Sequence, residues 1–263
     1  MSDGGTRGPA AEVKTAKACD AVQADADTPS ARVKTAMRAA MRDAVAAIRP
    51  FARTRRAERM VATVLRSPAL AGCGAGGGGA RGAVPGAMPR AVPGAMPGAM
   101  PGAMLVLLYR AMPDEIEVDG IVRALAARGA RLAFPMVGDD GALRLLEVAA
   151  SDPLDPAHWT RDRFGIAAPN TDSPAVRRVR ARELDAVVVP GRAFDRRGAR
   201  LGRGKGFYDA LLGRLRPDAR RATVGVCFRE QLVDCVPEDG HDRRVAFVAA
   251  EGRLFRRGNA PKA

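Results

Sequence analysis

The chain has 263 residues, enough for one sizeable domain or two small ones, and we expect one. No run of eighteen or more apolar residues occurs, and the N-terminal stretch lacks the basic-then-apolar pattern of a secretory signal. We therefore expect a cytoplasmic protein without membrane contact. The four cysteines form no C-x-x-C pair, so we interpret them as free thiols rather than as a zinc site or a disulfide framework.

The formal net charge of +14 is the composition's strongest feature and suggests a nucleic-acid partner. The arginines, however, are spread over almost every segment, and aromatic residues make up only 4%, which leaves few platforms for stacking bases. We therefore expect no nucleic acid. With only two histidines, the chemistry must rely on carboxylates, lysine and arginine.

In chain order, residues 1–29 show no helical or strand period and are expected to form a flexible leader. From Ser30 to Ile48, apolar residues recur at steps of three and four, which predicts an amphipathic helix closed by Pro50. A second helix is expected from about Thr54, as a possible N-cap, to Ser67. Residues 71–103 are a low-complexity Gly/Pro/Ala/Met insert with a period of four, which we interpret as a tolerated flexible expansion.

Strands and helices then alternate along the rest of the chain. Strands are expected at 105–109, 132–134, 143–148, 185–189, 222–228 and 245–249, with helices ending at Gly129 and spanning 208–215. This order predicts a single three-layer α/β domain, a mostly parallel sheet flanked by helices, over residues 30–252. Residues 253–263 are expected to form a flexible tail.

The stretch from Val187 to Leu212 carries the residues suited to chemistry. After a buried strand, glycines at 202, 204 and 206 let backbone N–H groups turn toward an anion, and the following helix offers its N-terminal dipole. The cations Arg200, Arg203 and Lys205 are expected to surround these amides. The carboxylate of Asp209, one turn into the helix, is suited to hold a magnesium ion beside phosphates. A tight structural turn is the alternative, but it does not explain the cations and the carboxylate together.

The string from Pro190 to Asp209 matches P-G-x-x-F-D-x-x-G-x-R-L-G-x-G-x-G-[YF]-Y-D without a gap. In this the chain resembles the 5-formyltetrahydrofolate cyclo-ligase family, also called 5,10-methenyltetrahydrofolate synthetase. The resemblance covers nearly all of residues 30 to 250 except the insert. It includes K-x-x-x-R in the first helix, M-P-D-E after the first strand, a tryptophan, G-I-A-A-P from Gly165, and V-P-E-D-G-H-D-R-R-V-A from Val236. The sequence departs from the family pattern at Ala246, where aspartate is usual, which puts the strength of magnesium binding in doubt.

The resemblance implies roles for individual residues. ATP would be bound by Lys34, Arg38, Arg200, Leu201, Gly202, Arg203, Gly204, Lys205, Gly206, Phe207 and Tyr208. The folate would be contacted by Glu115, Trp159, Arg203, Gly204, Lys205, Gly206 and Phe207, with Lys205 and Arg203 as catalytic residues and Asp209 and Asp242 as magnesium ligands. From the residues alone, Glu115 also suits a helix N-terminus, and Trp159 suits a core anchor as well as a wall for the pterin.

The implied activity is ATP-dependent cyclisation of 5-formyltetrahydrofolate to 5,10-methenyltetrahydrofolate, with ADP and phosphate released. The implied cofactor is Mg²⁺, the substrates are ATP and the reduced folate, and we expect a monomer. Two rivals stay open. One is another enzyme on a similar scaffold, such as a sugar-phosphate isomerase or a CoA-transferring enzyme, and the other is a nucleic-acid-binding protein or a relative without activity.

Overall fold

The computed structural model describes residues 29–73, 102–149, 151–162 and 164–258. The expected leader lies outside the described residues apart from Pro29, and the insert lies outside them apart from residues 71–73 and 102–103. Among the described residues, no helix is both long enough and apolar enough to cross a membrane.

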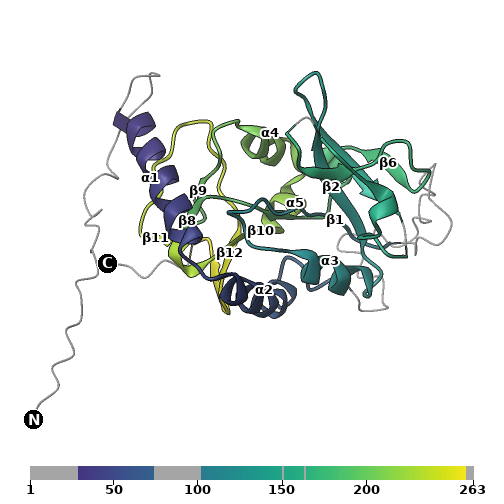
Figure 1. The fold of residues 1–263 in the computed structure, drawn as a ribbon, viewed down its shortest axis with the longest axis horizontal. Coiled ribbons are helices and arrows are strands. Elements are labelled where there is room, and N and C mark those ends of the chain that lie inside the picture. Colours follow the sequence, from purple (N-terminus) through teal and green to yellow (C-terminus); the bar gives the residue numbers. More distant parts are fainter. Residues whose placement is uncertain (1–28, 74–101, 150, 163, 259–263) are drawn as a thin grey trace, which may run out of the picture.

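An eight-stranded sheet with the order β13-β12-β10-β7-β1-β2-β3-β6 forms the centre of the molecule (Figure 1). The strands are β1 Leu105–Leu107, β2 Arg131–Val137, β3 Leu143–Val148, β6 Val176–Val179, β7 Ala186–Val189, β10 Thr223–Cys227, β12 Phe247–Ala250 and β13 Arg253–Arg256. The five central strands pair in parallel, whereas β3, β6 and β13 are added antiparallel at the two edges. This confirms the predicted mostly parallel α/β sheet.

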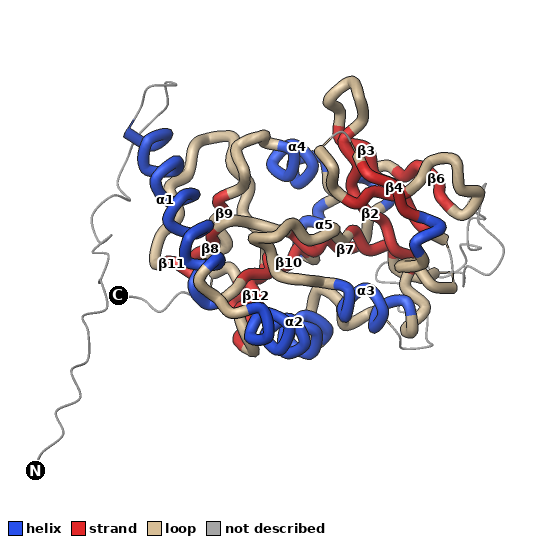
Figure 2. Tube along the Cα trace, in the orientation of Figure 1, coloured by secondary structure: helices blue, strands red, loops and turns tan. Residues whose placement is uncertain are grey.

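Helices cover both faces of the sheet, as the tube in Figure 2 shows. The helices α2 (Pro50–Leu65) and α3 (Asp119–Ala126) lie on one face, and α4 (Phe207–Arg214) and α5 (Pro217–Arg221) lie on the other. Because strand side chains alternate, Val106 packs into the core beneath α2 and α3, and Leu105 and Leu107 pack into the core beneath α4 and α5. Burial on both faces explains why the central strands are apolar without interruption. The three-layer prediction is confirmed.

The first helix, α1 (Pro29–Ala46), packs beside a small three-stranded sheet rather than over the main one (Figure 1). This sheet has the order β11-β8-β9, with β8 Ala193–Asp195, β9 Arg200–Leu201 and β11 Leu232–Val233. Met37 and Met41 of α1 pack in an apolar cluster with Leu201 of β9 and with Val236, which follows β11. A hairpin of β4 (Trp159–Arg161) and β5 (Ala167–Pro169) and short 3-10 helices at Pro156–His158, Ala181–Glu183 and Arg229–Gln231 complete the described elements.

Three expectations need correction. Helix α2 begins at Pro50 rather than near Thr54, because a proline at the first helical position needs no N–H partner and so starts a helix as readily as it ends one. The tail is not flexible at residues 253–256, which form β13 and pair with β12. Cys73 and Cys227 are free, but Cys235 is in a disulfide bond, so the free-thiol expectation is wrong at that position.

Candidate functional site

A cavity of about 690 Å³ lies where α1, the loop after β1, the tip of the β4–β5 hairpin, the glycine-rich segment and the loop after β11 meet. Every predicted site residue except Trp159 lines it: Lys34, Arg38, Glu115, Arg200, Leu201, Gly202, Arg203, Gly204, Lys205, Gly206, Phe207, Tyr208, Asp209 and Asp242. Its volume is in the range of small-molecule sites. The structure therefore brings together segments that are up to about two hundred residues apart in the sequence.

The glycine-rich segment needs its glycines at two positions in particular. Gly204 has φ of 95° and Gly206 has φ of 69°, in the left-handed region that side chains disfavour. Gly206 is the N-cap of α4, so the helix begins at the cavity and its first N–H groups face that end. Lys205 lies between the two glycines, exposed and without an ion pair to any residue that the structure describes.

Two basic residues of α1 reach this segment and the loop after β11. Arg38 Nε donates a hydrogen bond to the Gly202 carbonyl at 2.9 Å. Lys34 Nζ lies 2.6 Å from a carboxylate oxygen of both Asp239 and Asp242. Burial opposes the charged form of Lys34, but hydrogen bonds to these carboxylates outweigh it and raise the pKa of the ammonium group; the same hydrogen bond lowers the pKa of Asp239.

The two predicted magnesium ligands are neighbours. Asp209 Oδ1 accepts a hydrogen bond from the backbone N–H of Arg243, the residue after Asp242, at 3.1 Å. Each carboxylate already faces a cation, since Arg200 Nη2 lies 2.9 Å from Asp209 Oδ2 and Lys34 contacts Asp242. The site is thus built to hold positive charge.

No group of three or more His, Cys, Asp or Glu side chains in the described part of the chain could hold a metal by itself. A metal at this pair would need its other ligands from phosphate and water. That donor set suits Mg²⁺, which commonly binds through one or two carboxylates and substrate phosphates. Ala246 is not part of this site: its N–H donates to Thr223 Oγ1 at 2.8 Å and its side chain packs against the core.

In the same cavity, Glu115 and Arg203 form a charged pair. Arg203 Nε donates to Glu115 Oε1 at 3.1 Å, and Arg203 also forms a close ion pair with Asp114. Asp114 is shared with Arg192, which lies just after β7. The Glu115 side chain is only 8% exposed. Burial raises the pKa of its carboxyl group and outweighs the opposing effect of Arg203.

Tyr208 lines the cavity and carries a hydroxyl group that could bind a ligand. Its hydroxyl is buried and makes no hydrogen bond within the described part of the chain, while the Arg200 guanidinium lies 5.7 Å from its ring centroid. Burial raises the pKa of the phenol, so it stays protonated at neutral pH. A buried hydroxyl without a partner is costly, and a ligand that supplies a hydrogen bond would remove that cost.

Trp159 is a core anchor and does not line the cavity. Its ring packs edge-on against Phe134 at 4.9 Å between centroids, and its Nε1 donates to the Pro153 carbonyl at 3.0 Å. Arg110, which does line the cavity, lies over the ring at 4.8 Å. Trp159 thus contributes to the site only by supporting Arg110.

Like Tyr109, Phe207 and Tyr208, Phe164 lines the cavity, and it was not among the predicted site residues. It sits at the tip of the β4–β5 hairpin with 51% of its surface exposed. Asp162 Oδ1 accepts hydrogen bonds from the N–H groups of Phe164 and Ile166, which fixes the turn. Its position directly before G-I-A-A-P was the available signal. With Pro135, Val137, Leu143 and Ile166 it forms an apolar wall.

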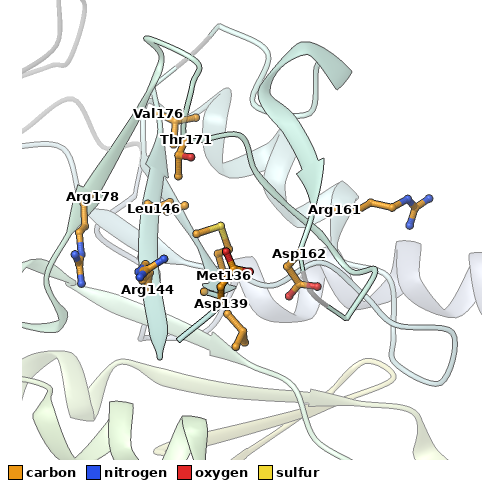
Figure 3. Close-up of a pocket in the computed structure, with 11 residues that line it drawn as sticks. Met136, Asp139, Arg144, Leu146, Arg161, Asp162, Thr171, Val176 and Arg178 are labelled. Carbon is orange, nitrogen blue, oxygen red and sulfur yellow. The ribbon is translucent and has the colours of Figure 1, made fainter. Parts of the chain in front are cut away.

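A second cavity of about 500 Å³ adjoins the first, since Val137 and Asp162 line both. It lies between the strands β2, β3 and β6 and the β4–β5 hairpin (Figure 3). Arg144 and Arg178 stand on the strands, whereas the Arg161 side chain points away from the group. None of the predicted site residues lines this second cavity.

Comparison with known proteins decides between the families open to this geometry. The model of the 5-formyltetrahydrofolate cyclo-ligase family matches residues 98–251, more than half of the chain. The chain belongs to this family. The cyclo-ligase family is a family of enzymes, so the sequence-based family assignment and the prediction of an enzyme are both confirmed.

Individual relatives agree with the cyclo-ligase assignment. The 5-formyltetrahydrofolate cyclo-ligase of Mus musculus is 27% identical over 149 residues, which cover 56% of this chain and 72% of the relative. That of Mycolicibacterium smegmatis is 32% identical over 141 residues, covering 51% and 66%. In three dimensions, the NMR structure of Aquifex aeolicus 5,10-methenyltetrahydrofolate synthetase superposes with a TM-score of 0.63 at 22% identity, covering 88% of this chain and 96% of that one. The likeness to the Aquifex aeolicus structure supports the α/β fold described above.

Proposed function

We propose that this protein uses ATP to cyclise 5-formyltetrahydrofolate to 5,10-methenyltetrahydrofolate, releasing ADP and phosphate. The observation that carries the proposal is the convergence of α1, the glycine-rich segment, the loop after β11 and Glu115 on one cavity. This cavity has a cationic side suited to phosphates and an apolar wall suited to the aromatic part of a folate. The family match supports the choice of substrate.

In the proposed reaction, the formyl oxygen attacks the γ-phosphorus and the bond from that phosphorus to the ADP oxygen breaks. The formyl carbon, now activated as an iminium phosphate at N5, is attacked by N10, which loses its proton. The C–O bond then breaks and phosphate leaves, which gives the methenyl bridge. Alignment and charge neutralisation are the main demands of such phosphoryl transfer, and this chain supplies them with cations rather than with a nucleophile.

The residues fit distinct roles in this reaction. Lys34, Arg38 and Arg200 bind the phosphates of ATP, while Arg203 and Lys205 stabilise charge that develops on the transferred phosphoryl group. Asp209 and Asp242 hold Mg²⁺, which when bound shields the negative charge of the phosphates. Arg203 is well placed because it also contacts Glu115, the proposed folate-binding carboxylate.

Lys205→Ala tests the proposed catalytic role. Because Lys205 is exposed and makes no ion pair with a described residue, the fold should persist while turnover falls by about 10²- to 10³-fold. The measurement is methenyltetrahydrofolate absorbance at saturating substrates, beside thermal unfolding of both proteins. The matched control is Arg253→Ala, an exposed cation on β13 outside the cavity, which should keep normal turnover. Near-normal turnover of Lys205→Ala would remove this residue from catalysis.

A further inference from the structure

Asp239 has no role in the family pattern, yet it is the second partner of a buried lysine. Lys34 is only 7% exposed, and its ammonium group lies 2.6 Å from Asp239 Oδ2 and 2.6 Å from Asp242 Oδ2. Both carboxylates are themselves largely buried, with side chains 17% and 14% exposed. The lysine therefore stands between two carboxylates that are three residues apart.

The two carboxylates differ in what else holds them. Asp239 Oδ1 accepts a hydrogen bond from Ser30 Oγ of α1 at 3.1 Å, so its contacts join α1 to the loop after β11. Asp242 Oδ2 accepts the Asp239 backbone N–H at 2.8 Å and belongs to the pair of carboxylates suited to Mg²⁺. Asp239 thus contacts α1 through Ser30 as well as Lys34, whereas Asp242 contacts Lys34 and directly precedes Arg243, whose N–H binds Asp209.

Binding of Mg²⁺ at Asp242 would compete with Lys34 for the same carboxylate. Two cations on one carboxylate repel each other, and a buried ammonium group left without a partner is strongly unfavourable. A lysine with Asp242 as its only partner would be driven out of the cavity just when its charge is needed by the phosphates. Asp239 would remove this conflict, because it offers Lys34 a second carboxylate that is not among the predicted metal ligands.

We propose that Asp239 is a positioning residue that holds Lys34 in the phosphate-binding cavity while Asp242 exchanges Lys34 for the Mg²⁺ that accompanies ATP. In the structure, Lys34 supplies the positive charge beside Asp242 that Mg²⁺ would supply when bound. When the magnesium nucleotide binds, the lysine keeps Asp239 and turns its remaining hydrogen-bond capacity to phosphate. The inference rests on the proposed function and deepens its nucleotide site.

The exchange can be tested by calorimetric titration of the full chain with ADP, once in the presence of Mg²⁺ and once with a chelator in place of Mg²⁺. This measurement does not require turnover. Asp239→Asn should weaken Mg²⁺–ADP binding by about 10-fold and ADP binding without Mg²⁺ by less than about 3-fold, because Asp242 then still holds Lys34. Asp239→Glu should recover most of the affinity. Glu238→Gln is the matched control, since Glu238 pairs with Arg244 outside the cavity, and it should bind as the wild type does.

A Lys34→Met background separates positioning from a general structural effect. If Asp239 acts through Lys34, adding Asp239→Asn to that background should change Mg²⁺–ADP affinity by less than about 2-fold. An equal loss with and without Mg²⁺, or an undiminished loss in the Lys34→Met background, would overturn the inference while leaving the proposed function intact. Wild-type protein that does not bind Mg²⁺–ADP would overturn both.

Discussion

Glu115 is a residue of this cavity whose ionisation is expected to cost stability. Its carboxyl group is buried against Arg203, and burial raises its pKa despite that arginine. A carboxylate whose folded-state pKa lies above its unfolded value destabilises the fold as pH rises through the interval between the two values. The folate contact proposed for Glu115 would account for a carboxylate at this position.

Glu115→Gln should therefore change the pH dependence of stability with a defined sign. As pH rises through the range in which Glu115 ionises, wild-type protein carries a cost that the glutamine variant does not have, so the melting temperature of the variant should rise relative to that of wild type. Turnover should fall by about 10- to 100-fold, since a charged hydrogen bond to substrate is lost. Thermal unfolding at several pH values gives the comparison, and a difference that is constant or moves toward wild type would contradict this account.

At the level of elements, the start of α4 is the part of the site that depends most on backbone conformation. Gly204 and Gly206 both have positive φ, whereas Gly213, in the last turn of the same helix, has ordinary helical geometry and open space beside it. These glycines offer a matched comparison within one element.

Gly206→Ala should lower the free energy of unfolding by about 1–2 kcal/mol, because alanine is strained in the left-handed region. It should also reduce turnover, because the helix N-terminus at the cavity moves. Gly213→Ala should raise stability by about 0.5–1 kcal/mol through helix propensity and leave turnover unchanged. Denaturant unfolding at equilibrium measures both. A Gly206→Ala variant as stable as Gly213→Ala would show that the N-cap conformation is not required.

The sequence predicted helices and strands better than it predicted contacts between side chains. Apolar runs and spacing located six of the eight strands of the main sheet, because these patterns reflect burial directly. The edge strands β6 and β13 were not predicted, because both are short and carry arginines. Pro50 was misplaced because proline suits both the end and the start of helices. The spacing of Lys34 and Arg38 indicated that they share one face of a helix. The partner Asp239, however, lies 205 residues away from Lys34, and no local sequence pattern links the two. For the same reason, the sequence left two roles open for Trp159 and assigned none to Phe164, since only the position of the hairpin shows that Phe164 lines the cavity and that Trp159 packs against the core.

At the scale of the whole molecule, the described residues on either side of the stretch 74–101, Cys73 and Met104, do not line the cavity. The flanks of this stretch come together, since Cys73 Sγ lies 3.5 Å from Met104 Sδ, and the family match begins only at residue 98. The packing of α2 and β1 on either side is continuous with the main core. The protein should therefore tolerate a shorter connection.

Replacing residues 74–101 by a Gly-Ser linker of roughly a quarter of that length should keep turnover within about 2-fold of wild type. The free energy of unfolding should rise by about 1 kcal/mol, because closing a loop four times shorter costs less entropy. Turnover and denaturant unfolding test the two parts. A folded variant that loses turnover would show that the segment takes part in the reaction.

The most direct test of the account is turnover of the full chain with 5-formyltetrahydrofolate, followed by the absorbance of methenyltetrahydrofolate. Four mixtures, with and without ATP and with and without Mg²⁺, separate the requirements of the reaction. The account predicts product only when ATP and Mg²⁺ are both present, together with one ADP per methenyl group formed. Product formed equally well without ATP, or no product in the complete mixture, would contradict it.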